Sequence, residues 1–291
     1  MISIFTPTYN RKHLLPRLYD SLCRQSSKDF EWLIVDDGST DGTKEYVEKI
    51  KEEKKIVISY YFQKNSGKHV AHNKAVDMAS GELFFCVDSD DILAYENTIQ
   101  GILAYWDTVK QEREYAGMVS YKGFFNETIL GDCFPEDLDY CSTFNLARKY
   151  HSNGERNIIY SLTYLRKVSY PIFKNEKFCP DSYISDFLSK EYTMKLRRNV
   201  DVLCEYQEDG LSRNFARLMK RNPKGFCIAN MQIIDMHDNW KEKCSAAIHF
   251  WAFKFLADDK TILYNSNKNR WLVNICSIPG WCMSIYYKVR L

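Results

Sequence analysis

The first 110 residues repeat one pattern, in which a short apolar run is followed by an amphipathic segment. The apolar runs, each expected to be a strand, are ISIFTP (2–7), EWLIVDD (31–37), KIVISYYF (55–62) and ELFFCVD (82–88). Apolar residues recur at helical spacing in segments 12–26, 43–53, 69–79 and 96–110. Four such alternations predict an α/β fold, a Rossmann-like, mostly parallel central sheet flanked by helices and connected by right-handed crossovers.

The pattern loosens after residue 112. YAGMVSY (115–121) and NIIYSLT (157–163) are expected to be strands, and 182–196 and 213–220 are expected to be helices with a strand-like run, VDVLCEY (200–206), between them. From Pro223, which suits a first helical turn, the chain is expected to form long helices. We therefore predict a domain over 1–222, with halves 1–110 and 111–222, followed by a helical C-terminal extension over 223–291.

Charge and cysteine usage narrow the class of protein. The formal net charge of the 291-residue chain is +2, and acids and bases are interleaved over the first 250 residues, so no nucleic-acid partner is expected. The ten cysteines are scattered without a CxxC pair, which argues against zinc and for reduced thiols. No signal-like segment or apolar run of spanning length is present, which predicts a cytoplasmic protein.

In parallel sheets, ligands bind beyond the carboxyl ends of the strands. Polar residues follow three of the predicted strands, namely Thr6 to Asn10, Asp36 with Asp37, and Asp88 with Asp90. These segments are far apart in the sequence, and the predicted topology brings them to one edge of the sheet.

The run VDSDDIL places three acids, Asp88, Asp90 and Asp91, directly after an apolar strand. Like charges this close repel one another unless a counter-charge is present. Carboxylate oxygens suit Mg²⁺ or Mn²⁺, which take one or two protein carboxylates together with substrate phosphates. A turn or a helix cap is the alternative, and we expect Asp91 to cap the helix that follows.

The other edge motifs suit a nucleotide. Tyr9 could stack on a flat ring, and a carboxylate in VDDGSTDGT could accept a hydrogen bond from a ring N–H. Lys68, after Gly67 at a helix start, could meet an anion. Ordinary structural roles for these residues remain open, respectively a core-covering tyrosine, a capped turn and a solvated lysine.

Together, SIFTPTYNR, FEWLIVDDGSTDGT, GKHVAHNKAVDMASGEL and FFCVDSDDIL closely resemble glycosyltransferase family 2, which has the GT-A fold. The resemblance covers residues 1 to about 110 in order and at the family's spacing, and a weaker likeness continues to about 225.

The resemblance implies that Thr6, Tyr9 and Asp37 meet the nucleobase, with Asp36 beside them, and that Asp90 and Asp88 bind Mn²⁺ or Mg²⁺. The full set of residues expected to bind the nucleotide-sugar is Thr6, Pro7, Tyr9, Asn10, Asp36, Asp37, Lys68, Asn73, Asp88, Ser89 and Arg213.

Family members invert the anomeric centre with one carboxylate base. The candidate here is Asp181 in KFCPDSYISDFL, although Ser185 stands where the family usually has an aromatic residue. Asp186 and Glu176 are the fallbacks. QEDGLSRN (207–214) resembles the acceptor-side loop, where Arg213 could pair with a phosphate.

The expected activity is metal-dependent, inverting transfer of a sugar, most often from a UDP-sugar, to a glycan or polyprenyl-linked acceptor in surface polysaccharide synthesis. Two alternatives are a nucleotidyltransferase, which the glycine-free TPTYNR disfavours, and a non-catalytic nucleotide-sugar-binding member, which the intact acidic motif disfavours.

The composition of the C-terminal segment predicts where in the cell the protein lies. After Asp259 the chain has no acidic residue, and its lysines and arginines are interleaved with tryptophan, tyrosine and aliphatic residues. This composition suits a segment, 260–291, lying on an anionic membrane surface at the inner face of the membrane. A tail packed on the domain is the alternative.

Overall fold

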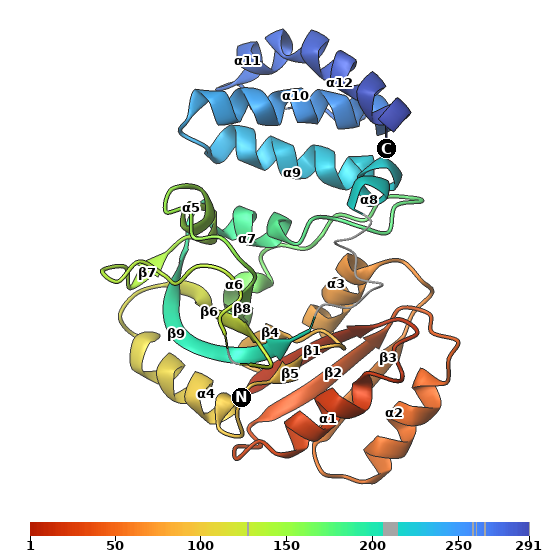
Figure 1. The fold of residues 1–291 in the computed structure, drawn as a ribbon, viewed down its shortest axis with the longest axis vertical. Coiled ribbons are helices and arrows are strands. Elements are labelled where there is room, and N and C mark those ends of the chain that lie inside the picture. Colours follow the sequence, from red (N-terminus) through yellow and green to blue (C-terminus); the bar gives the residue numbers. More distant parts are fainter. Residues whose placement is uncertain (127, 206–214, 258, 260, 265, 291) are drawn as a thin grey trace. The chain divides into compact units, whose positions relative to one another are not determined.

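The structure is a computed structural model that describes residues 1–126, 128–205, 215–257, 259, 261–264 and 266–290. The chain forms two compact units (Figure 1). Unit 1 comprises Met1–Ser169 and Glu191–Gln207, and unit 2 comprises Tyr170–Lys190 and Glu208–Leu291. Segment 170–190 thus belongs with the C-terminal helices, and the functional boundary expected after residue 222 stays a prediction.

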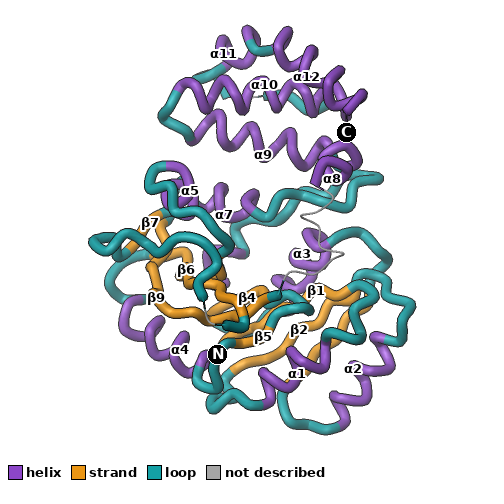
Figure 2. The backbone as a smooth tube through the Cα atoms, viewed as in Figure 1, coloured by secondary structure: helices purple, strands orange, loops and turns teal. Residues whose placement is uncertain are grey.

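In unit 1 the described residues form one nine-stranded sheet (Figure 2) with the order β3-β2-β1-β4-β8-β6-β9-β5, and β7 pairs with β9. The strands are β1 Ile2–Thr8, β2 Phe30–Asp36, β3 Val57–Phe62, β4 Leu83–Cys86, β5 Ile92–Leu93, β6 Tyr115–Phe124, β7 Tyr140–Cys141, β8 Arg156–Ser161 and β9 Thr193–Cys204.

The four strands predicted from the repeating pattern, β1 to β4, are parallel neighbours, as expected. β8 then runs antiparallel to both β4 and β6, and β6 pairs in parallel with β9. The predicted strands 115–121 and 157–163 correspond to β6 and β8.

Successive side chains along a strand point to opposite faces of the sheet, and each face is covered by different helices. Ile2 and Ile4 lie in one apolar core with residues of α1 (Leu15–Cys23), α2 (Thr43–Glu52) and α4 (Thr98–Val109). Phe5 points to the opposite face, where its ring contacts His72 of α3 (Lys68–Met78). The sheet is therefore covered on both faces, as a doubly wound fold requires.

One predicted helix is wrong in its second half. Segment 182–196 was expected to be helical throughout, but α7 covers only Ser182–Leu188 and β9 begins at Thr193. β9 pairs along its length with β6, and this tertiary pairing overrides the helical propensity of its Lys, Leu and Arg residues. The two-residue strands β5 and β7 and the short helices α5 (Thr143–Arg148) and α6 (Leu162–Leu165) were not predicted, because such short elements carry no periodicity.

Unit 2 is helical, as predicted for the C-terminal extension. It contains α7 and then α8 Phe215–Arg221, α9 Pro223–Met236, α10 Trp240–Ala257, α11 Arg270–Ile275 and α12 Ser277–Arg290. Pro223 occupies the first turn of α9, as expected. An apolar core joins α9, α10, α11 and α12 through residues such as Phe226, Phe250, Val273 and Tyr287.

All ten cysteines are free thiols, which agrees with the prediction from their spacing. Among the described helices, none combines the length and the apolar character needed to cross a bilayer.

Candidate functional site

The carboxyl ends of β1, β2 and β4 meet at one edge of the unit 1 sheet. Thr8 is in register with Asp36, and the backbone N–H of Asp37 donates to the carbonyl of Thr8 over 2.8 Å. On the other side of β1, the N–H of Val87 donates to the carbonyl of Phe5 over 2.9 Å. The predicted convergence of the three polar segments follows directly from this parallel register.

Asp36 is fully buried and holds the loop after β2 in place. Its carboxylate accepts hydrogen bonds from the backbone N–H of Ser39 at 2.7 Å and from the Tyr60 hydroxyl at 2.7 Å. Burial and this carboxylate raise the pKa of Tyr60, so the phenol remains a donor. Asp36 is therefore a supporting residue beside the site.

Asp37 ties together the loops after β2 and β3. It accepts hydrogen bonds from Gln63 Nε2 at 2.8 Å and from the backbone N–H groups of Ser66 at 2.7 Å and Gly67 at 2.8 Å. A carboxylate offers about four lone-pair sites. Asp37 can thus accept one further hydrogen bond, as the predicted contact with a base requires.

The residues after β1 differ in exposure. Thr6 is fully buried, and its hydroxyl donates to the carbonyl of Val87 at 2.8 Å and accepts from Trp32 Nε1 at 2.9 Å. Its side chain therefore joins β1 to β2 and to the residue that follows β4, and its main chain is the part left to face a ligand. Pro7 is partly buried in β1, whereas Tyr9 is half exposed, as a stacking platform needs.

Asn10 adopts a left-handed conformation, with φ of 52°, and connects the loops after β1 and β2. Its N–H donates to Ser39 Oγ at 2.8 Å, and its side-chain oxygen accepts from the N–H of Thr40 at 2.8 Å. Asparagine tolerates this backbone conformation better than most residues. Asn10 thus shapes the site's rim.

The acid cluster, which we define as Asp88, Asp90 and Asp91, is paired with basic side chains. Lys68 Nζ lies 2.9 Å from Asp88 Oδ1, and Arg11 Nη1 lies 2.6 Å from Asp90 Oδ2. Burial raises the pKa of Asp88, but Lys68 and, further off, Lys122 and Arg11 hold it down to about 2. Asp88 is consequently ionised at neutral pH.

Asp91 does not cap a helix, so that prediction is wrong. α4 begins at Thr98, after Asn97, while the buried carboxylate of Asp91 forms an ion pair with Lys122 of β6 over 2.8 Å. Burial raises the pKa of Asp91 to about 7 against the attraction of Lys122, whose own pKa is raised by the acids despite its burial. Asp91 therefore anchors the acid cluster to β6.

Three further predicted residues differ in their relation to this cluster: Lys68 pairs with Asp88, Ser89 lies within it, and Asn73 is five residues further along α3 than Lys68. Lys68 is the first residue of α3, but the N–H of the preceding Gly67 is already taken by Asp37. At this helix start, the positive charge that an anion could meet is therefore the side chain of Lys68. Asn73 is partly buried on α3, and Ser89 is buried between Asp88 and Asp90.

The donor set fits a hard divalent cation. Asp88 and Asp90 offer oxygen ligands at a partly exposed edge, and Mg²⁺ or Mn²⁺ needs no more than one or two protein carboxylates. Among the described residues, no group of three or more His, Cys, Asp or Glu side chains is arranged to hold a metal without further ligands. The remaining ligands would therefore be water and substrate oxygens.

The predicted base lies in unit 2. Asp181 is exposed at the start of α7, makes no capping hydrogen bond to the described backbone of that helix, and accepts at its carbonyl from the Tyr170 hydroxyl over 3.1 Å. Of the fallbacks, Asp186 is buried and Glu176 accepts from the backbone N–H groups of Lys224 and Gly225 at the start of α9. Arg213 and the whole loop 207–214 lie outside the described residues.

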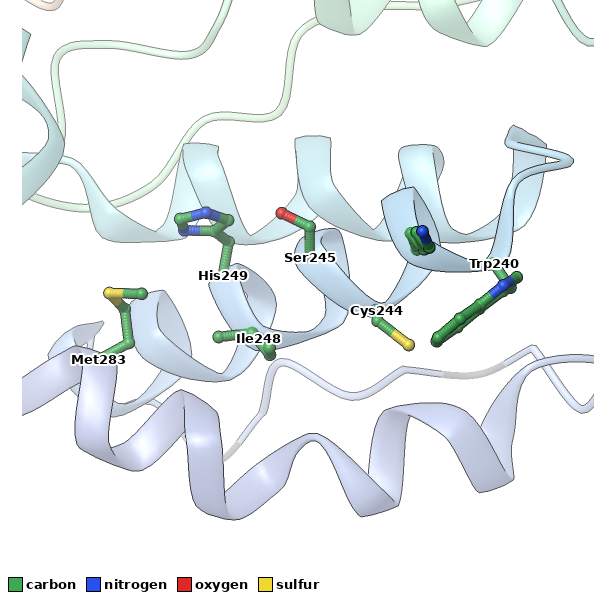
Figure 3. A pocket seen from close by; sticks show the side chains of 7 residues that line it. Trp240, Cys244, Ser245, Ile248, His249 and Met283 are labelled. Carbon is green, nitrogen blue, oxygen red and sulfur yellow. The ribbon is translucent and has the colours of Figure 1, made fainter.

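A pocket of about 340 Å³ lies elsewhere, on unit 2 (Figure 3). Its lining is mostly apolar and comes from α10 with Met283 of α12. None of the predicted site residues that the structure describes lines it.

Three basic residues of the site were missed. Arg11 pairs with Asp90, Arg17 Nη2 donates to the carbonyl of Asp90 over 2.6 Å, and Lys122 pairs with Asp91. The repulsion among the acids already called for a counter-charge, and Arg11 follows the TPTYN motif directly. Lys122 carried no local signal, because only the sheet topology brings β6 to this edge.

A family model, Glycosyl transferase family 2, matches residues 3–168, more than half of the chain. A validoxylamine A glucosyltransferase of Streptomyces hygroscopicus is 38% identical over 108 residues, which are 36% of this chain and 25% of that protein. The chain aligns with no more than 36% of the length of the first curated relatives it matches.

Solved structures share the fold. S. aureus TarS 1-349 in complex with UDP-GlcNAc matches with a TM-score of 0.62 at 17% identity, over 99% of this chain and 91% of that one. A mannosyltransferase from Pyrobaculum calidifontis in complex with GDP-Man and Mn²⁺ matches with a TM-score of 0.57 at 16% identity, over 98% and 87%. With the strand order, the edge motifs and the family match in agreement, the chain has the GT-A fold and belongs to glycosyltransferase family 2.

Proposed function

We propose that this chain transfers a sugar from a nucleotide-sugar, most often a UDP-sugar, to a glycan or polyprenyl-linked acceptor in surface polysaccharide synthesis. The observation that carries the proposal is the meeting of exposed Tyr9, Asp37 and the Asp88/Asp90 pair at one sheet edge. Structures with the same fold hold UDP-GlcNAc in one case and GDP-Man with Mn²⁺ in the other, which supports a nucleotide-sugar donor.

Each residue has a distinct part in the proposed reaction. Tyr9 stacks on the base, and Asp37 accepts a hydrogen bond from a ring N–H. A divalent cation held by Asp90 and Asp88 would supply electrostatic stabilisation of the leaving diphosphate. Asp181 takes the proton of the acceptor hydroxyl as that oxygen attacks the anomeric carbon. Attack from the face opposite to the leaving group inverts the configuration.

The carboxylates can be tested separately. Because Asp90 would hold the cation, Asp90→Asn should abolish Mn²⁺-dependent release of UDP from a panel of UDP-sugars. Because Asp181 would only move a proton, Asp181→Asn should lower turnover about 10²- to 10⁴-fold while leaving UDP binding unchanged.

The matched control is Asp107→Asn, which changes an exposed aspartate on α4 that pairs with Lys110, and it should retain full turnover. Near-normal turnover by the Asp181 variant would move the base to another residue. UDP-sugars that neither bind nor react with any variant would contradict the transferase proposal itself.

We also propose a peripheral membrane contact through segment 260–291. The residues that form an exposed apolar ridge along α11 and α12 are Trp271, Ile275, Ile278, Trp281, Ile285 and Val289. Their spacing of three or four places them on one side of successive turns, while Val273, Cys276 and Tyr287 pack on the core. Exposed Lys268, Arg270 and Lys288 flank the ridge, and no acid follows Asp259. Apolar surface edged by positive charge suits anionic lipid.

Vesicles containing phosphatidylglycerol test this contact. The double variant Trp271→Ser, Trp281→Ser should lose co-flotation with the vesicles, because it removes the two largest ridge side chains. The control Val57→Ser, Phe62→Ser removes exposed apolar side chains from unit 1 and should float as the unmodified protein does. Equal flotation of both variants would contradict the proposal.

A further inference from the structure

Each acid of the acid cluster faces a base from a different part of unit 1. Lys68 comes from α3, Arg11 from the loop after β1, and Lys122 from β6. The three pairs balance in formal charge. The cluster therefore already has counter-charges before any metal is bound, and a divalent cation has to compete with them.

The three ion pairs differ in how readily they can open. Lys122 and Asp91 are 14% and 6% exposed, and separating such a buried pair would leave an uncompensated charge. Arg11 and Asp90 are both 21% exposed, and Lys68 and Asp88 are 30% and 35% exposed. Both pairs are more accessible to solvent than the Lys122–Asp91 pair, so opening them costs less when another ligand takes over the carboxylate.

Arg11 is held beside the cluster but is not confined to it by burial. Its pairing partner, Asp90, is fixed separately, because the Asp90 carbonyl accepts a hydrogen bond from Arg17 and the neighbouring Asp91 is anchored to Lys122. Loss of the Arg11 contact would therefore leave the Asp90 backbone in place. An arginine released from a carboxylate is well suited to phosphate, because its planar donors match both groups.

We propose that Arg11, together with Lys68, exchanges partners when the donor and cation bind: the cation takes the Asp88 and Asp90 carboxylates, and the released basic side chains pair with the donor's diphosphate. This inference rests on the proposed function. It assigns Arg11 to the diphosphate-binding set.

Coupled binding follows from the exchange. The diphosphate draws Arg11 and Lys68 away from the carboxylates that the cation needs. The cation in turn occupies those carboxylates and so releases Arg11 and Lys68 to the diphosphate. Each ligand therefore strengthens the binding of the other by the same factor, as linkage requires. For couplings of ordinary size this factor is about 5- to 150-fold.

Titration calorimetry with Mn²⁺ alone, UDP alone and each in the presence of the other measures this factor. In the unmodified full chain, UDP should tighten Mn²⁺ binding at least about 5-fold. Arg11→Gln should bind Mn²⁺ more tightly without UDP, bind UDP more weakly, and show a smaller coupling factor. Arg11→Lys should restore part of the coupling, because it retains the charge without the bidentate geometry.

Lys12→Gln is the matched control, because it removes a positive charge from the exposed residue next to Arg11. The backbone N–H of Lys12 donates to Asp41, which is not a member of the acid cluster. Lys12→Gln should leave the coupling unchanged, and circular dichroism should show both variants folded. If UDP and Mn²⁺ bind with the same coupling in Arg11→Gln as in Lys12→Gln, the exchange is wrong while the proposed function stands. If UDP does not bind the unmodified protein, both proposals fail.

Discussion

Thr6 shows how a single hydroxyl can be structural at the edge of a site. It donates to a carbonyl after β4 and accepts from Trp32 on β2, so it connects the central strands beneath the predicted base site. Thr6→Val keeps the shape of the side chain but leaves both partners unpaired in the core. We expect a loss of about 1–3 kcal/mol in the free energy of unfolding, measured by urea denaturation.

Ser59→Ala, at a partly exposed position on β3, serves as the control for Thr6 and should change stability much less. If Thr6→Val instead weakened UDP binding at unchanged stability, the side chain would have a direct part in the site.

His72 gives the fold a dependence on pH. Burial against Phe5 and Phe84 lowers its pKa to about 3, and the charge of Lys68 adds to this effect. In the unfolded chain a histidine has a pKa of about 6.5. Between these two values the unfolded chain binds a proton that the folded chain does not, so stability falls as the pH is lowered below about 6.5.

The slope from this one group is at most about 1.4 kcal/mol per pH unit. Urea unfolding between pH 7 and pH 4.5 should therefore show a shallower decline for His72→Gln than for the unmodified protein. His13→Gln, at an exposed position on the loop before α1, should decline as the unmodified protein does. Parallel declines for all three proteins would contradict the role of His72.

At the residue scale, the sequence identified the acids but not their partners. Asp36, Asp37, Asp88 and Asp90 follow apolar strands, and that position alone predicted where they lie. The partnership of Asp91 with Lys122 joins residues brought together by strand order, which no local pattern encodes. The choice between a helix cap and a buried ion pair was therefore beyond sequence reasoning.

At the scale of elements, Gly280 sets how closely α12 approaches α10. A Cβ at this position would lie 2.3 Å from the Cβ of Trp251 and 2.9 Å from the carbonyl oxygen of Ile248. Gly280→Ala should therefore push the two helices apart and destabilise unit 2 by about 1–3 kcal/mol, measured by chemical denaturation.

The same substitution in α4 is the control for Gly280. A Cβ at Gly101 would lie 2.9 Å from Nη2 of Arg197 and meet no backbone atom of another element, and alanine also favours the helix by about 1 kcal/mol, so Gly101→Ala should destabilise the protein less than Gly280→Ala does. Equal destabilisation by the two variants would show that α12 tolerates a wider separation from α10.

The elements that the sequence predicted well are those with a long, regular pattern. The four parallel strands and their helices were predicted because each carries several apolar residues at a constant spacing. β9 was half mistaken for a helix because its pairing with β6 is remote in sequence. Its register also shifts along that pairing, which blurs the alternation expected of a strand.

At the scale of the whole molecule, the chain leaves unit 1 after Ser169, returns at Glu191, and leaves it again after Gln207. The sequence suggested a single division near residue 222, because the change in composition is visible only there. Contacts within unit 2 explain the difference, since Lys177 N–H donates to Asn222 Oδ1 and the Phe178 ring stacks on Phe226.

Because the chain passes from unit 1 to unit 2 and back, one part of unit 2 leaves the ribosome well before the rest of that unit. Segment 170–190 is synthesised before β9, yet the helix it packs against, α9, ends only at Met236. At about 5–20 residues per second, the segment waits for its partner on the order of seconds. During that interval Phe178 and Ile184, buried or partly buried in the finished protein, are open to chaperones, and nascent chains stalled before α9 should be their best substrates.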